Sequence, residues 1–95
     1  MKLVYMAFQE NEESGPVVAS IIEDNPGATV RRYPAMVRIE AEGALTVKRE
    51  SVERRLEREW DPQELHLYLI SLAGNVSETD DEFTVSWGSA QAKGQ

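Results

Sequence analysis

Four carboxylates crowd together near the C-terminal end of the chain, and they are the first candidates for chemistry. Glu78, Asp80, Asp81 and Glu82 could in principle hold a cation. They lack the Asp-x-Asp/Asn-x-Asp/Asn-Gly spacing of an EF-hand and the Glu that closes its loop. Carboxylates in a turn are usually hydrated. We therefore expect solvated charge here rather than a metal site, with weak, adventitious calcium binding at most.

The other reactive side chains form no recognisable catalytic set. His66 is the single histidine, so this chain alone cannot supply the paired Glu-x-x-His motifs of a di-iron site. Its place between two leucines favours a structural or surface role over that of a general base. Ser71 lacks the Gly-x-Ser-x-Gly context of a nucleophile, and the glycines form no phosphate-binding motif. We expect no catalytic residues, no cofactor and no bound metal.

The composition limits the kinds of partner that the protein can bind. The chain has 95 residues, a net charge of −7 and no cysteine. This charge repels phosphate backbones and anionic lipids, so we expect neither nucleic acid nor membrane as a partner. The absence of cysteine suits the reducing cytoplasm, and the apolar start is too short for a signal peptide. The length predicts one domain, over residues 1–87, with a flexible polar tail over residues 88–95.

The first half of the chain reads as a strand, a helix and two more strands. Residues 2–8 are apolar on both faces, which predicts a strand covered on both sides. An apolar stripe of helical spacing predicts a helix over residues 15–24, ended by Asn25-Pro26-Gly27. Strands are then expected over residues 28–33 and 36–41, with a break at Pro34.

The next segment alternates in a way that predicts a hairpin. Pairing Ile39 with Val47 and Ala41 with Leu45 places the apolar side chains on one face. This register requires a three-residue loop, residues 42–44.

A short amphipathic helix is expected after this hairpin. Val52, Leu56 and Trp60 follow each other at helical spacing, and Asp61-Pro62 would end the helix. Its arginines alternate with glutamates, which favours a salt-bridged, solvated face over an anion site. The two tryptophans are expected in the core.

Residues 65–73 are apolar on both faces and are interpreted as a strand, with a helix as the alternative. Phe83, Val85 and Trp87 alternate with polar residues and would form its hairpin partner. One face of the 65–73 strand would then need cover from the first helix or from a partner protein. The whole pattern predicts an α+β fold: a small single domain of two strand-helix-strand-strand units, with a largely antiparallel sheet and short helices.

Six blocks of the sequence together resemble the small cofactorless regulatory proteins of bacterial multicomponent di-iron monooxygenases, most closely those of phenol hydroxylases. In chain order the blocks are EDNPGATV (23–30), MVRIEAEG (36–43), KRESVE (48–53), REWDPQEL (58–65), ISLAGNV (70–76) and DDEFTVSW (80–87). The chain begins almost at its first strand, unlike relatives with a long N-terminal extension, so contacts made by such a tail are not expected here.

The resemblance implies a non-catalytic effector that binds the di-iron hydroxylase, acts only indirectly with the reductase, and promotes coupled aromatic hydroxylation. It also implies a partner-binding segment near the hydroxylase surface, made of Ile70, Ser71, Leu72, Ala73, Gly74 and Asn75. Small side chains there would permit close approach, and Gly74 would allow an unusual backbone shape. The alternative that the residues leave open is a small acidic binding module for an unrelated protein or ligand.

Overall fold

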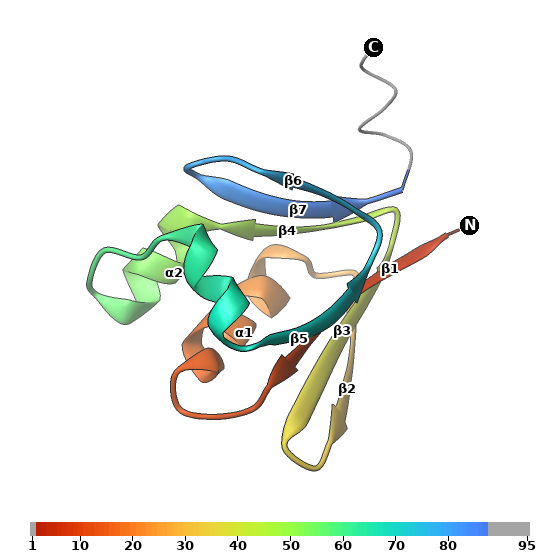
Figure 1. The fold of residues 1–95 in the computed structure, drawn as a ribbon, viewed down its shortest axis with the longest axis horizontal. Helices are drawn as coiled ribbons and strands as arrows, with labels where there is room; N and C mark the ends of the chain where they lie inside the picture. Colours follow the sequence, from red (N-terminus) through yellow and green to blue (C-terminus); the bar gives the residue numbers. More distant parts are fainter. Residues whose placement is uncertain (1, 88–95) are drawn as a thin grey trace.

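Strands and short helices alternate along the computed structural model, which describes residues 2–87 (Figure 1). In chain order the elements are β1 (Leu3–Gln9), α1 (Ser14–Asp24), β2 (Thr29–Tyr33), β3 (Met36–Glu42), β4 (Ala44–Lys48), α2 (Arg49–Leu56), the 3₁₀ helix η1 (Pro62–Leu67), β5 (Leu69–Ala73), β6 (Asn75–Glu78) and β7 (Glu82–Ser86). All strand pairs among these residues are antiparallel. The predicted α+β class is confirmed.

The strands form two sheets rather than one. The first has the order β2-β3-β1-β5 and the second the order β4-β7-β6. The chain passes from the first sheet to the second at two single residues, Gly43 and Gly74, and both have a positive φ. The backbone N–H of Gly43 donates to the Lys2 carbonyl, and that of Trp87 donates to the Gly43 carbonyl. These bonds fasten one corner to both ends of the described chain.

One hydrophobic core fills the space between the two sheets and the helices. Alternation along β1 directs Val4, Met6 and Phe8 into it, and all three are fully buried. Leu45, Val47, Phe83 and Val85 enter from the second sheet, and Val17, Val18 and Ile21 from α1. Helix α1 packs against β4 and α2. Both helices therefore lie on the inner side of the first sheet, as Figure 1 shows.

Helix α1 forms where the sequence predicts it. Asn11 and Ser14 exchange backbone-to-side-chain hydrogen bonds just before and at its first residue. Asn25 ends it, because its side-chain amide donates to the Ile21 and Thr46 carbonyls and accepts from the Thr46 N–H. The residue that stops the helix thus also joins it to β4.

The predicted hairpin between residues 36–41 and 45–47 is wrong. Ile39 pairs with Met6 and Val30, whereas Val47 pairs with Phe83. The alternation was correct, since both side chains are buried. The chain turns a corner at Gly43 instead of reversing, so the two strands contribute to the same core from different sheets.

The predicted strand over residues 65–73 is correct only in its second half. Its beginning is the end of η1, where Leu65 and the C-cap residue Tyr68 are buried three residues apart while Leu67 is 72% exposed. Asp61 caps η1, with its side chain accepting from the Gln63 N–H, so Asp61-Pro62 begins a helix rather than ending one. β5 pairs with β1, and β7 pairs with β4 and β6, so the expected 65–73 hairpin with residues 83–87 is also wrong.

Helix α2 is shorter than predicted. It ends at Leu56, with Glu57 in the left-handed region, and Trp60 is buried from the loop that follows. Glu53 holds this loop to the helix: its Oε2 accepts from the Trp60 N–H and from Arg49 Nε, each at 2.9 Å. These two bonds, the Trp60 bond foremost, lower the pKa of the Glu53 carboxyl. The predicted tail over residues 88–95 lies outside the described residues.

Replacing Glu53 by Gln should weaken the fold in a pH-dependent way. A folded-state pKa below the unfolded value of about 4.3 means that the stabilisation is present above that pH and is lost as the pH falls through the folded pKa. Urea unfolding of Glu53→Gln should give a lower free energy than wild type at pH 7. Between roughly pH 5 and pH 3 the variant should lose less stability than wild type does.

Glu50→Gln is the matched control, because the Glu50 side chain is 86% exposed and lies 3.9 Å from Arg54. Its unfolding free energy should stay close to that of wild type. Equal pH profiles for Glu53→Gln and wild type would show that this carboxylate does not stabilise the loop.

Candidate functional site

The side chains that were candidates for catalysis are spread over the surface. His66 is exposed, with its ring in a T-shaped contact with Phe83 and its Nε2 3.9 Å from Glu78 Oε1. In the described part of the chain, no three acidic or histidine side chains gather closely enough to hold a metal ion. Among residues 2–87, none of the helices is both long enough and apolar enough to pass through a membrane.

The acidic cluster of residues 78–82 lies on the exposed turn between β6 and β7. Thr79 organises this turn, because its hydroxyl accepts from the N–H groups of Asp81 and Glu82. The carbonyls of Asp80 and Asp81 accept from the Arg49 side chain and backbone. The turn is thereby joined to the start of α2 through backbone carbonyls, and its carboxylates face water.

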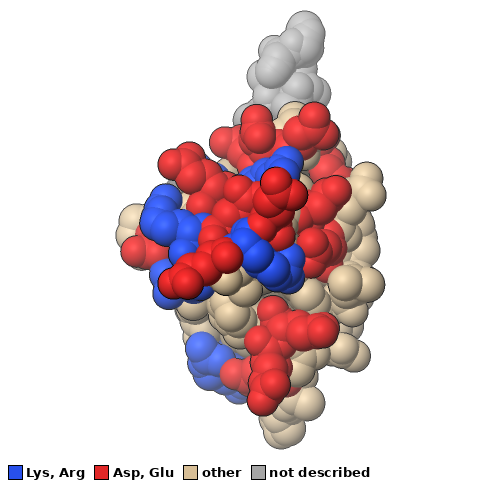
Figure 2. Space-filling view, turned by 90° about the vertical axis from the view of Figure 1, so that its left-hand side faces the viewer, with Lys and Arg blue, Asp and Glu red and all other residues tan. Residues whose placement is uncertain are grey.

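Charged side chains of both signs crowd one end of the molecule. Figure 2 shows acidic and basic groups intermingled on the face that carries α2 and the β6–β7 turn. The ion pairs there include Arg49 with Glu53, Arg54 with Glu50, and Arg58 with Glu64. This agrees with the predicted salt-bridged, solvated face.

Among residues 2–87, no helix and no second sheet packs on the side of the first sheet that faces away from the core. Strand β1 was predicted to be covered on both sides, but Leu3 is 54% exposed there and Tyr5 is partly exposed. Directly opposed residues of neighbouring strands point to the same side of a sheet. The pairings therefore define one surface, the outer face: Leu3, Tyr5, Ala7, Gln9, Thr29, Arg31, Tyr33, Met36, Arg38, Glu40, Glu42, Ser71 and Ala73.

A cluster of charged and aromatic groups occupies the middle of the outer face. The Glu40 carboxylate, 8% exposed as a residue, accepts a hydrogen bond from Arg31 Nε at 3.1 Å. Arg38 Nε approaches its other oxygen to 2.9 Å without aligning an N–H on it. The Arg38 guanidinium lies over the Tyr5 ring, 3.8 Å from its centroid. The sequence pattern alone did not indicate this cluster, although a tight turn at Pro34-Ala35 would place Arg31 opposite Arg38.

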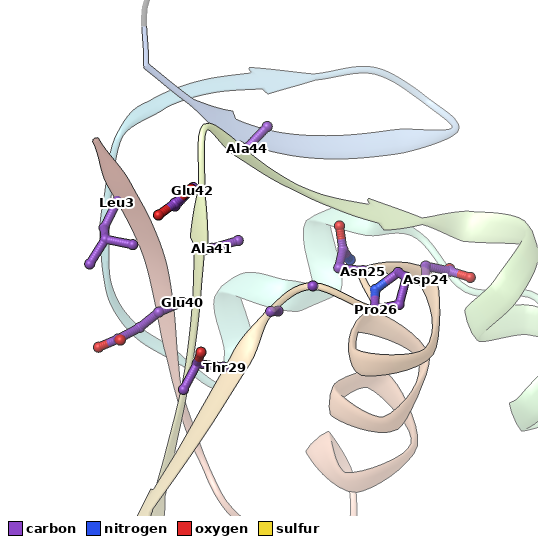
Figure 3. A pocket seen from close by; sticks show the side chains of 11 residues that line it. Leu3, Asp24, Asn25, Pro26, Thr29, Glu40, Ala41, Glu42 and Ala44 are labelled. Atoms are coloured by element: carbon purple, nitrogen blue, oxygen red, sulfur yellow. The ribbon is translucent and has the colours of Figure 1, made fainter. Parts of the chain in front are cut away.

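An open hollow of about 540 Å³ lies beside this cluster, between β3 and the turn after α1. Figure 3 shows Glu40 and Leu3 directed to the outer side of the sheet, while Ala41 points to the other side. The hollow exists because β2 begins at Thr29, which pairs with Glu40, and leaves the end of β3 without a neighbour on that side. Asp24 is on its rim and points away from it (Figure 3).

The six residues predicted to bind a partner lie along β5 and the corner that follows. Ile70, Ser71 and Asn75 are exposed, and Ala73 is half-buried beside Tyr5 on the outer face. A β-bulge explains the exposure of Ile70. Leu69 pairs with Phe8 and Ser71 with Ala7, so Ile70 has no partner on β1 and is pushed outward. Leu72 instead packs against the core.

Gly74 has a role inside the fold. Its φ is +134°, and a Cβ at this position would overlap Val85 Cγ1 and come within 3.1 Å of Val4 Cγ1. The glycine therefore lets the two sheets approach each other at this corner. The expected unusual backbone conformation at Gly74 is confirmed. A residue without a side chain is needed there because of packing inside the domain.

The described residues form a small α+β domain with an exposed sheet face and a charged opposite end. Residues 2–86 match the model of the MmoB/DmpM family. The stimulatory component DmpM of phenol 2-monooxygenase from Pseudomonas sp. (strain CF600) is 52% identical over 85 residues, covering 90% of this chain and 94% of that protein. The chain belongs to the MmoB/DmpM family.

Solved structures share the fold. A chain of the phenol hydroxylase–regulatory protein complex has a TM-score of 0.89 and 45% identity, covering 92% of this chain and all of that chain. A second structure of such a complex gives a TM-score of 0.84 at 43% identity, covering 90% of this chain and all of that one. Regulatory protein B of soluble methane monooxygenase, at 16% identity, has a TM-score of 0.73 and covers 98% of this chain and 70% of that chain. The last likeness concerns the fold alone.

Gly74→Ala should destabilise the domain more than Gly43→Ala does. Both glycines have a positive φ, so either alanine adds backbone strain of roughly 1 to 2 kcal/mol. At Gly43 nothing lies within 4 Å of the added Cβ, whereas at Gly74 Val85 must move. Overpacking should add about 1 to 3 kcal/mol. Urea unfolding of both variants measures the difference, and equal losses would show that packing at Gly74 is loose.

Proposed function

We propose that this protein is the cofactorless regulatory component of a phenol-type multicomponent monooxygenase. It binds the hydroxylase component and promotes efficient, coupled aromatic hydroxylation, and it takes no part in the bond-making chemistry. The observation that carries the proposal is the match to DmpM, a stimulatory component by name, at 52% identity over 85 residues. The fold shared with a chain of the phenol hydroxylase–regulatory protein complex supports the same partner.

The described surface suits this role. An effector without catalytic groups can act only through a difference in its affinity for two conformations of the enzyme. Such selection needs a rigid surface, and the outer face is backed by a continuous core. A specific interface of ordinary size buries roughly 800 Å² on each partner, which one face of a domain this small can supply. We place the protein in the cytoplasm, where a chain with no cysteine is suited to the reducing conditions.

We further propose that residues 70–75 contact the hydroxylase. The exposed side chains of Ile70, Ser71 and Asn75, and the small Ala73 beside them, support this assignment. Leu72 and Gly74 would contribute by holding the segment in shape from inside. The carboxylates of the β6–β7 turn lie at the charged end with α2, away from the outer face, so they would act on the partner only through long-range charge.

Steady-state phenol hydroxylation tests the function directly. Purified hydroxylase and reductase should form product faster, and with less electron loss to peroxide, as this protein is added. Stimulation should saturate near one effector per hydroxylase active site. A titration that leaves product formation and coupling unchanged over the whole range would leave the alternative of a binding module for another partner.

Ala73→Leu tests the segment. The larger side chain adds bulk on the outer face, so the effector concentration for half-maximal stimulation should rise about tenfold or more, equivalent to about 1.4 kcal/mol of binding energy. Ala19→Leu on α1 is the matched control: Ala19 is also half-buried but is not part of the outer face, and its variant should stimulate as wild type does.

Thermal unfolding of both leucine variants, alongside Ile39→Ala as a core reference, separates binding from folding. Truncating fully buried Ile39 should cost about 2 to 5 kcal/mol of stability. A folded Ala73→Leu that stimulates at wild-type concentrations would place residues 70–75 outside the interface.

A further inference from the structure

The charge of the molecule is unevenly distributed. On the outer face, Arg31 and Arg38 balance Glu40 and Glu42, so the whole net charge of −7 belongs to the rest of the chain. Charged groups of both signs crowd the end that carries α2 (Figure 2). The outer face is therefore the part of this acidic protein that an acidic partner can approach with the least repulsion.

The Arg38 side chain is preorganised on the outer face. Its guanidinium is stacked on Tyr5 and lies beside the Glu40 carboxylate, which Arg31 fixes from the other side. Its side chain remains about one-third exposed, and within residues 2–87 its two Nη groups donate no hydrogen bond. A stacked guanidinium loses little further conformational freedom on binding, and its planar fork matches a carboxylate.

We propose that the outer face docks on the hydroxylase and that Arg38 is its anchor, with the Nη groups donating to a carboxylate of the hydroxylase. This inference rests on the proposed function and adds to it the face, the residue and the chemistry of the partner group. The hollow beside Glu40 would receive a neighbouring side chain of the hydroxylase. Residues 70–75 would form one edge of the same interface, since Ser71 and Ala73 belong to the outer face.

A second copy of this chain fits the face less well. In a two-fold symmetric pair whose axis passes through the middle of the outer face, Arg38 would lie opposite the Arg38 of the other copy. Like charges brought together at an interface are unfavourable. A carboxylate-bearing partner surface removes this repulsion and provides an acceptor for the Nη groups.

Arg38→Gln, Arg38→Lys and the control Arg54→Gln test the anchor. Arg54 lies on α2 with its side chain 65% exposed, away from the outer face. With hydroxylase and reductase, Arg38→Gln should raise the half-maximal effector concentration at least tenfold and flatten its dependence on salt. Arg38→Lys should recover only part of the affinity, because lysine keeps the charge but loses the fork. Arg54→Gln should stay within about twofold of wild type.

The inference is overturned if Arg38→Gln stimulates at wild-type concentrations, or if Arg38→Lys is as good as arginine. In either result the wild-type protein still stimulates the hydroxylase, so the proposed function is unaffected and only the role of Arg38 as the anchor is contradicted. Absence of stimulation by wild-type protein would instead overturn the function.

Thiol footprinting tests the face without changing Arg38. The chain has no cysteine, so Thr29→Cys and Glu50→Cys each create a single reactive thiol. Thr29 lies on the outer face on β2, far across the sheet from β5, and Glu50 lies on α2. Adding hydroxylase should slow maleimide labelling of Thr29→Cys at least fivefold and leave Glu50→Cys unchanged. Equal protection, or protection of Glu50→Cys alone, would show that another face docks.

Discussion

The rest of the structure depends on the close contact of the two sheets at Gly74, where the chain passes from one sheet to the other and no side chain separates them. Gly74 lets Val4 of the first sheet and Val85 of the second meet across the corner. Both helices contribute side chains to this one core, so they lie on the inner side of the first sheet. Among residues 2–87, the outer side of that sheet is left uncovered by helices.

The local pattern of the sequence predicted the elements better than their partners. Helix α1 and strands β1 to β3 form within about one residue of the expected bounds, because apolar periodicity and turn residues act locally. Pairing could not be predicted in the same way. Alternation shows that Ile39 and Val47 are buried, but two sheets sharing one core bury them equally well without joining them. The 3₁₀ helix η1 was not predicted, because the spacing of its leucines also fits a strand.

The family resemblance, rather than any chemical motif, indicated residues 70–75 as the partner-binding segment, and that assignment stays a prediction. Exposure of Ile70 depends on a bulge opposite β1, which no periodicity within β5 reveals. The role of Arg38 could not be recognised from the sequence, because arginines interspersed with glutamates usually form ordinary surface ion pairs. Its stacking on Tyr5 joins residues far apart in sequence and becomes visible only when β1 and β3 are side by side. The buried carboxylate of Glu40 could not be identified from sequence for the same reason.

The two tryptophans have different surroundings, so their intrinsic fluorescence can report on two different parts of the molecule. Trp60 is 1% exposed in the core, where its indole N–H donates to the Tyr68 hydroxyl. Trp87 is 37% exposed, with its indole N–H donating to the Leu3 carbonyl at the edge of the outer face. Emission from Trp60 is shielded from aqueous quenchers until the chain unfolds. Emission from Trp87 is open to quenching in the free protein, so the two signals separate loss of the fold from events at the sheet surface.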